Sequence, residues 1–157
     1  MKGGSKMYES DVAIQLKETH HKISQVLQHK IDEYGISFGL LFLTMRIYNN
    51  PNANQKELAQ QMKFTEGAMS NAVKRLIKLK MLKQVPLETD MRYNRLVITD
   101  LGISMIDDYK EYVVKKYKDM FEGLDEEELK KLQMSLIKIN KNLDRMNTNI
   151  DSMGKTE

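Results

Sequence analysis

Apolar residues in the first third of the chain recur at helical spacing. Across residues 11–34 they return every three or four positions, which predicts an amphipathic helix, and Gly35 is placed to end it. Residues 36–48, ISFGLLFLTMRIY, are apolar almost all round, as in a helix at the centre of a small domain. The apolar positions of the first helix are Val12, Leu16, Ile23, Val26, Leu27 and Ile31.

Two helix start signals follow in the middle of the chain. Asn54 and Glu57 have the spacing of a capping box, in which each side chain bonds to the backbone amide of the other residue. Thr65 is a second N-cap candidate, and Glu66 lies in the first turn, where the helix dipole favours a carboxylate. Two short helices joined by about three residues have the outline of a helix-turn-helix.

The period of the pattern changes after Leu82. Residues 83–99, KQVPLETDMRYNRLVIT, hold two β-prone runs around a polar tip at 88–94, which predicts a hairpin. Pro86 indicates an edge strand, because proline cannot donate to a sheet ladder. Two helices are expected at 100–121 and 124–150, separated by Gly123, and Asp125 and Glu128 repeat the capping-box spacing.

The last helix carries a heptad seam, in which apolar residues alternate at spacings of three and four. A seam about three heptads long needs other helices to cover it. Packing of three helices within one chain would do so, but long helices flanking a compact middle favour a homodimer built from both chain ends. The seam residues are Leu129, Leu132, Leu136, Ile139, Leu143, Met146 and Ile150.

The composition narrows the functional classes. No apolar run reaches the ~20 residues that cross a bilayer, and MKGGSKMYES lacks the apolar region of a secretory signal, so a cytoplasmic protein is expected. The absence of cysteine excludes disulfides and thiol chemistry. The sequence shows no Ser/His/Asp arrangement, metal-ligand spacing or glycine-rich phosphate loop, so an enzyme, a cofactor and a metal site are not expected.

Positive charge is concentrated in the middle of the chain. The net charge is +3, but residues 1–62 carry seven Lys/Arg and six Asp/Glu, residues 63–99 carry eight and three, and residues 100–157 carry ten and thirteen. The middle segment is therefore +5, and no acidic residue lies between Gly67 and Lys83. Such a segment is either an ordinary solvated surface or one that binds phosphates.

At about 100° per residue, the predicted second helix of the helix-turn-helix has two faces. Met69, Ala72, Val73, Leu76 and Ile77 fall on the side expected to be buried. On the other side small residues allow close approach, Ser and Asn can read base edges, and lysines can meet phosphates, so this face favours nucleic acid. It consists of Gly67, Ser70, Asn71, Lys74 and Lys78, with Arg75 just beside it.

The predicted hairpin tip adds an independent signal. Its sequence DMRYNR offers Arg92 and Arg95 with Tyr93 between them, as a wing that reaches the adjacent DNA backbone or minor groove would. Asp90 is expected to hold Arg92 by a charge-assisted hydrogen bond, or else to be an ordinary turn aspartate.

The segments NQKELAQQM, TEGAMSNAVKRLIKLKMLKQ and DMRYNRLVITDLG, in this order, resemble the MarR family of bacterial winged-helix transcription regulators. The resemblance covers residues 11–150 and implies a mainly α fold with a small β-hairpin wing and dimerisation helices from both chain ends. The most specific part lies in the hairpin and the following helix start, at Asp90, Arg92, Arg95, Val97, Ile98, Thr99 and Gly102.

This resemblance implies a homodimer that binds a pseudo-palindromic site on double-stranded DNA. The helix from Glu66 to Lys78 would lie in the major groove and Arg92 in the minor groove, oriented by Asp90. The candidate DNA-binding residues are Thr65, Glu66, Gly67, Ala68, Ser70, Asn71, Lys74, Arg75, Lys78, Asp90, Arg92, Tyr93 and Arg95.

Many members of the family release DNA when a small aromatic or anionic effector binds, and most of them are repressors. Zinc-sensing members use histidines after the wing, whereas all three histidines here lie in the first predicted helix, so metal sensing is not expected. The candidate effector residues are His20, His21, Phe38, Phe42, Met45 and Tyr48. Histidines on a helix are more commonly partly exposed surface residues, and apolar residues at this spacing are more commonly simple core.

The expected organisation has a flexible tail at 1–10, with Met7 as an alternative natural start, and a second tail at 151–157. Residues 11–34 and 101–150 would form the dimerisation region, and 36–100 the winged helix-turn-helix. The expected function is that of a ligand-responsive repressor. The alternative is a helical dimeric protein-interaction module without DNA binding, whose affinity would depend only weakly on salt.

Overall fold

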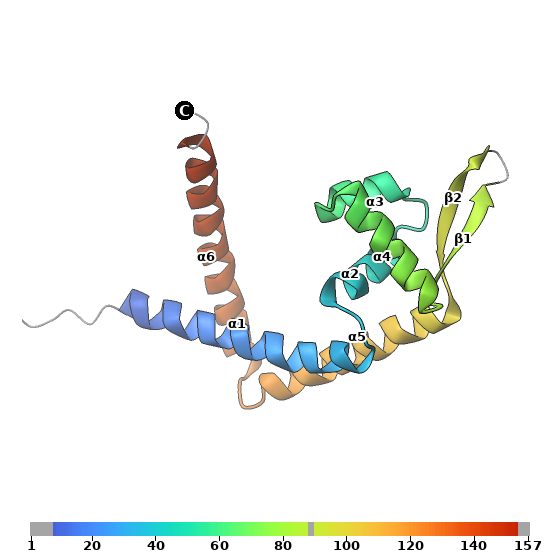
Figure 1. The fold of residues 1–157 in the computed structure, drawn as a ribbon. Coiled ribbons are helices and arrows are strands. Elements are labelled where there is room, and N and C mark those ends of the chain that lie inside the picture. Colours follow the sequence, from blue (N-terminus) through green and yellow to red (C-terminus); the bar gives the residue numbers. More distant parts are fainter. Residues whose placement is uncertain (1–7, 88–89, 154–157) are drawn as a thin grey trace, which may run out of the picture. The chain divides into compact units, whose positions relative to one another are not determined.

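The protein is a mainly helical chain with one two-stranded antiparallel hairpin (Figure 1). The structure, a computed structural model, describes residues 8–87 and 90–153, and it describes only the backbone of 87, 90–94 and 149–153. The chain divides into two compact units between Lys116 and Tyr117. The elements are α1 (Tyr8–Glu33), α2 (Phe38–Asn49), α3 (Gln55–Met62), α4 (Glu66–Lys78), β1 (Leu82–Leu87), β2 (Asp90–Ile98), α5 (Asp100–Met120) and α6 (Glu126–Met153).

Local capping chemistry sets several helix ends, as the sequence predicted. At the start of α3 the side chain of Asn54 accepts a hydrogen bond from the Glu57 amide at 2.9 Å, and Glu57 accepts one from the Asn54 amide at 3.1 Å. Asp125 and Glu128 form the same reciprocal pair before α6, with both bonds at 2.9 Å. Both predicted capping boxes are therefore confirmed.

Several expected boundaries need correction. Helix α1 begins at Tyr8, so the expected tail at 1–10 is helical from residue 8, and α6 runs to Met153, beyond the expected end at 150. Helix α2 begins at Phe38 because the Ser37 side chain accepts a hydrogen bond from the Leu40 amide at 3.3 Å, which caps the helix there. Strand β2 already begins at Asp90, so most of the expected polar tip at 88–94 is strand.

The hairpin is regularly paired at its base and irregular near its tip. The antiparallel register runs from Leu82 opposite Ile98 to Pro86 opposite Asn94, and it shifts between Pro86 and Leu87. A register shift bends and twists the strands locally. The direction in which the tip leaves the body is therefore set at the last regular pairs.

The core is built from the end of α1, from α2, α3 and α4, from the base of the hairpin and from the first half of α5. The prediction that α2 is buried all round is correct only in part, because Phe38 is 56% and Tyr48 is 40% exposed. One polar side chain, Thr44, is buried, and its hydroxyl donates to the Leu40 carbonyl at 2.8 Å. The most deeply buried apolar residues are Ile31, Leu41, Leu43, Ile47, Leu58, Met69, Val73, Leu76, Leu82 and Ile106.

The start of α5 is fixed against the turn that follows α4. The Thr99 hydroxyl donates to the Lys80 carbonyl at 2.6 Å and accepts from the Gly102 amide at 3.2 Å, while the Thr99 amide donates to the Met81 carbonyl at 3.1 Å. A Cβ atom at Gly102 would lie 2.5 Å from that same carbonyl oxygen. The Thr and Gly singled out in the sequence therefore allow the helix to begin in close contact with this turn.

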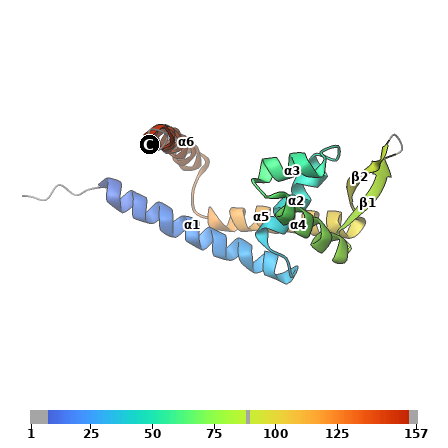
Figure 2. The same ribbon diagram turned by 45° about the horizontal axis from the view of Figure 1, so that its top comes forward.

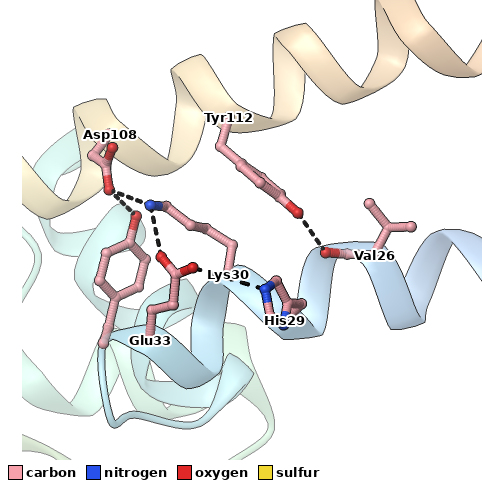
Figure 3. A network of polar contacts seen from close by, with 7 residues as sticks. Val26, His29, Lys30, Glu33, Asp108 and Tyr112 are labelled. Atoms are coloured by element: carbon pink, nitrogen blue, oxygen red, sulfur yellow. Dashed lines mark hydrogen bonds and ion pairs between the residues drawn. The ribbon is translucent and has the colours of Figure 1, made fainter.

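Helix α1 lies alongside α5 in both views (Figure 1 and Figure 2), and a polar network joins them (Figure 3). The Lys30 ammonium lies 2.9 Å from carboxylate oxygens of both Glu33 and Asp108, and its side chain is only 16% exposed. The Tyr34 hydroxyl donates to the same Asp108 oxygen at 2.6 Å. The Asp108 carboxylate on α5 therefore binds two donors, Lys30 in the last turn of α1 and Tyr34 directly after that helix.

The contacts of this network favour the charged forms of Lys30 and Asp108 and the neutral form of Tyr34. Hydrogen bonds to Glu33 and Asp108 raise the pKa of the Lys30 ammonium above its usual value. The hydrogen bond from Tyr34, followed by that from Lys30, lowers the pKa of the Asp108 carboxyl. Burial, together with the bond to Asp108, raises the pKa of Tyr34, which keeps its hydroxyl protonated as a donor.

The second unit consists of the end of α5 and all of α6. The α6 side chains that the structure describes are all exposed or half-buried, and none is buried. Leu132, Leu143 and Met146 of the heptad seam are 41%, 48% and 58% exposed, and the Ile150 side chain lies outside the described residues. Within the second unit, the seam is therefore left uncovered.

Within the described part of the chain, no helix has the length and apolar character that a membrane span requires.

Candidate nucleic-acid interface

Helices α3 and α4 form the helix-turn-helix that the sequence predicted. Lys63 ends α3 in a left-handed conformation, with φ of 54°, and the Phe64 amide donates to the Ala59 carbonyl at 2.9 Å. Thr65 then caps α4, where its hydroxyl accepts a hydrogen bond from the Ala68 amide at 3.1 Å. The predicted second N-cap is confirmed, and the turn directs α4 away from α3 within three residues, 63–65.

The buried face of α4 anchors the helix in the core. Met69, Val73 and Leu76 are at most 2% exposed. Ile77, which was expected on this face, is 37% exposed. It lies about 80° around the helix from Met69, at the margin of the apolar side, which explains the difference.

From Gly67 onward, the opposite face of α4 is exposed and free of carboxylates. We call Gly67, Ser70, Asn71, Lys74, Arg75 and Lys78 the basic ridge. All of these residues are exposed except Ser70, which is half-buried, and a Cβ atom at Gly67 would meet nothing within 4 Å.

The cations of the basic ridge have no partner among the described side chains. Lys74, Arg75 and Lys78 form no hydrogen bond, ion pair or ring contact with any side chain that the structure describes. By contrast Lys22, Lys130 and Lys131 on other helices pair with glutamates one turn away. The ridge can therefore offer its charge to an external anion without first breaking a pair with any described side chain.

The structure tests the predicted wing residues only in part. Asp90, Arg92 and Tyr93 belong to β2 by their backbone, but their side chains lie outside the described residues, so the expected Asp90–Arg92 pair stays a prediction. Arg95 is exposed, and its Nε donates to the Pro51 carbonyl at 3.2 Å. Sequence reasoning assigned Arg95 to DNA and missed this contact within the protein.

The structure does not bring the six candidate effector residues into one pocket. His20 and His21 are exposed on α1, and they line neither the hollow that Tyr48 borders nor the one that Phe42 and Met45 border. Tyr48 lines a small hollow beside β2.

Phe38 and Phe42, by contrast, lie together on the exposed side of α2. Their rings stack with centroids 6.0 Å apart, and the Arg46 guanidinium lies 4.9 Å from the Phe42 ring centre. Phe42 and Met45 also line an open hollow of about 490 Å³ that Arg46 and Gln61 border. Sequence reasoning missed Arg46, although its spacing of four from Phe42 on one helix face was a usable signal.

Among the side chains that the structure describes, no group of three or more His, Cys, Asp or Glu residues is placed to hold a metal ion.

Comparison with known proteins found relatives of the region that carries the basic ridge. Residues 45–92, from α2 into the wing, match the model of the MarR family. No curated protein matches the sequence. Staphylococcus aureus MepR, whose structure has a TM-score of 0.73 with this chain at 17% identity over 83% of this chain and 97% of its own, is a transcription regulator.

Three solved structures show how far the fold is shared. YusO from Bacillus subtilis has a TM-score of 0.78 at 18% identity over 88% of this chain and 99% of its own. Staphylococcus aureus MepR in complex with DNA has a TM-score of 0.74 at 18% identity over 83% and 98%. A MarR transcriptional regulator from Methanosarcina mazei has a TM-score of 0.62 at 21% identity over 87% and 99%. The chain therefore shares its fold over most of its length with these proteins, and its helix-turn-helix region is similar to the MarR family.

Proposed function

We propose that this protein is a homodimeric regulator that binds a specific, pseudo-palindromic site on double-stranded DNA. The observation that carries the proposal is the basic ridge, which is exposed, lacks carboxylates and has no cation paired with a described side chain. Protein–DNA affinity comes largely from neutralising phosphates, so free cations on a rigid helix meet the main energetic requirement. That MepR, which shares this fold, has been solved in complex with DNA supports the same role.

Different residues would contact the major and the minor groove of the duplex. Helix α4 would lie in the major groove, where Ser70 and Asn71 face base edges and the lysines meet phosphates. Arg92 would reach the minor groove from the wing, with Asp90 as its anchor and Tyr93 beside it. The major-groove set is Thr65, Glu66, Gly67, Ala68, Ser70, Asn71, Lys74, Arg75 and Lys78.

Two copies would be joined by their long terminal helices. The exposed seam of α6 and the exposed Val12 and Val26 on α1, at 50% and 43%, leave apolar surface that a second copy would cover. A two-fold pair would present two copies of α4 to half-sites about one helical turn apart.

We further propose that a small aromatic or anionic molecule releases the DNA, which makes the protein a repressor. The stacked Phe38 and Phe42 with Arg46 beside them offer an exposed surface for a planar ring. That MepR has been solved with bound ethidium supports an aromatic effector in this fold. Release is tested by adding ethidium and a set of aromatic acids to the protein–DNA complex. If no compound lowers DNA affinity, ligand-responsive repression by these molecules is rejected.

Selection from random duplex DNA tests the proposed binding. We expect the purified protein to enrich an inverted repeat, bind it as two chains per site, and prefer it to a shuffled duplex of the same composition. Asn71→Ala should relax the preference at one position of each half-site, because a base-reading side chain is lost. If nothing is enriched, and a duplex and a non-nucleic polyanion bind equally, DNA recognition is rejected in favour of a protein-interaction module.

A further inference from the structure

Arg95 joins two parts of the winged-helix domain that lie far apart in the sequence. Its Nε donates to the carbonyl of Pro51, 44 residues earlier, at 3.2 Å. Pro51 belongs to the turn between α2 and α3, whereas Arg95 lies on wing strand β2. The bond therefore connects the wing directly to the turn from which the helix-turn-helix begins.

The acceptor side of this bond is held firmly. The Asn50 amide donates to the Arg46 carbonyl at 2.9 Å, and the Ala53 amide donates to the Asn50 carbonyl at 3.1 Å. Ala53 is buried, and the next residue, Asn54, caps α3. The Pro51 carbonyl thus has a fixed position relative to α3, and through the helix-turn-helix relative to α4.

The donor side lies where the regular part of the wing ends. Arg95 pairs with Val85, one pair before the register shift that follows Pro86. Its neighbour Leu96 is buried at 3% exposure, so the strand is anchored to the core on one side of Arg95 and irregular on the other. A contact at this position sets the direction in which the rest of the wing leaves the body.

The bond borders a small hollow between the wing and the turn. The lining of this hollow includes Tyr48, Pro51, Arg95 and Ile103. The directional hydrogen bond spans this region, and it adds to the support that buried Leu96 gives the strand.

We propose that Arg95 is a positioning residue, which fixes the wing at a set distance from α4 by donating to the Pro51 carbonyl, and that it does not act by neutralising a phosphate. The proposal rests on the proposed DNA binding, in which the wing and α4 occupy neighbouring grooves and their separation must match the duplex. Arginine has five N–H donors, so one bond from Nε leaves the others in solvent and does not by itself exclude a phosphate contact. The test must therefore separate the hydrogen bond from the charge.

Two neutral variants make that separation. In Arg95→Gln the amide nitrogen occupies the same place along the side chain as Nε of arginine, so the donor is kept and the charge is lost. In Arg95→Met both the donor and the charge are lost at a similar side-chain length. The two variants differ from the parent equally in charge, and they differ from each other mainly in the bond to Pro51.

DNA affinity is measured for the parent and both variants between about 50 and 200 mM salt. If Arg95 is a positioning residue, Arg95→Gln should stay within about threefold of the parent at each salt concentration, while Arg95→Met should lose about 10-fold or more. The slope of log affinity against log salt should be unchanged in both variants. If Arg95 contacts a phosphate, both variants should weaken alike, and both slopes should fall by about 0.9 for each contact, which would overturn the proposal.

A second measurement needs no DNA. The chain contains no cysteine, so spin labels can be attached through cysteines introduced at Lys56 on α3 and at Pro86 on β1, both of which are exposed. The distribution of label distances should be equally narrow in the parent and in Arg95→Gln, and broader in Arg95→Met. Equal widths in all three proteins would reject the positioning role even if DNA binding is confirmed. If the parent fails to bind DNA, the proposed function fails, while this measurement still decides the role of Arg95.

Discussion

The ammonium of Lys30 lies 2.9 Å from the carboxylate of Asp108, and this ion pair ties the end of α1 to the middle of α5. Tyr34 donates to the same carboxylate, and the Tyr112 hydroxyl donates to the Val26 carbonyl at 3.0 Å (Figure 3). Because α5 begins directly after the wing, a firm α1–α5 contact also fixes the helix that leads out of the winged-helix domain.

The Lys30–Asp108 coupling should be independent of pH across the neutral range. The folded pKa of Asp108 is lowered, so its contribution is present above the ordinary value of 3.8 and is lost as pH falls through the lower folded value. The folded pKa of Lys30 is raised, so its contribution is present below 10.5 and is lost only as pH rises through the higher folded value. A double-mutant cycle with Lys30→Met and Asp108→Asn should give the same coupling in urea unfolding at pH 5.5 and pH 9.

One neighbouring histidine needs a control in that cycle. His29 Nε2 lies 3.9 Å from an oxygen of Glu33, the same carboxylate that holds Lys30. The cycle is therefore repeated with His29→Gln in every protein. A coupling that halves between the two pH values in this background would show that the pair is not held ionised as described.

Gly102→Ala should destabilise the protein by ~1–3 kcal/mol, because overpacking displaces the structure around the new methyl group. The added Cβ would lie 2.5 Å from the Met81 carbonyl oxygen, which cannot move freely since it accepts the Thr99 amide. Gly67→Ala is the matched control, because nothing lies within 4 Å of its new methyl group, and it should leave stability unchanged or raise it by up to ~1 kcal/mol. Urea unfolding at one protein concentration measures both, and equal effects would contradict the close approach at Gly102.

Leu143→Glu should weaken self-association by at least about 10-fold, because burial of a leucine contributes ~1.5–3 kcal/mol and the introduced charge must also be desolvated. Leu143 lies on the α6 seam and is 48% exposed in the single chain. Lys141→Glu, on the opposite side of the same helix, is the control and should leave the dimer intact. Sedimentation equilibrium measures the association constants. If Leu143→Glu associates as tightly as the parent, the seam is not the dimer contact.

The parts of this fold that depend on near neighbours in sequence could be predicted. The capping pairs Asn54–Glu57 and Asp125–Glu128 and the Thr65 cap lie within four residues of their partners, so their spacing alone identified the helix starts. The two faces of α4 followed from one helical period, except at Ile77 on the margin.

The contacts that hold these elements together could not be predicted. Tyr34 reaches Asp108 across 74 residues and Arg95 reaches Pro51 across 44, and no local pattern marks either pair. The charge of Arg95 suggested a phosphate contact, whereas its partner in the protein is the backbone carbonyl of Pro51. Every residue has such a carbonyl, so residue types give no sign of which one is used. The exposure of Phe38 and Tyr48 depends likewise on what the fold leaves uncovered.

The salt dependence of Lys74→Ala tests the role of the basic ridge most directly. Lys74 is exposed and has no partner among the described side chains, and Lys115 on α5 is an exposed lysine outside the ridge that serves as control. Affinity for the selected duplex is measured against salt for the parent, Lys74→Ala and Lys115→Ala. We expect the parent's affinity to fall steeply, the Lys74→Ala slope to be shallower by about 0.9 per protomer, and Lys115→Ala to match the parent. A Lys74→Ala slope equal to that of the parent would contradict the claim that the ridge faces DNA phosphates.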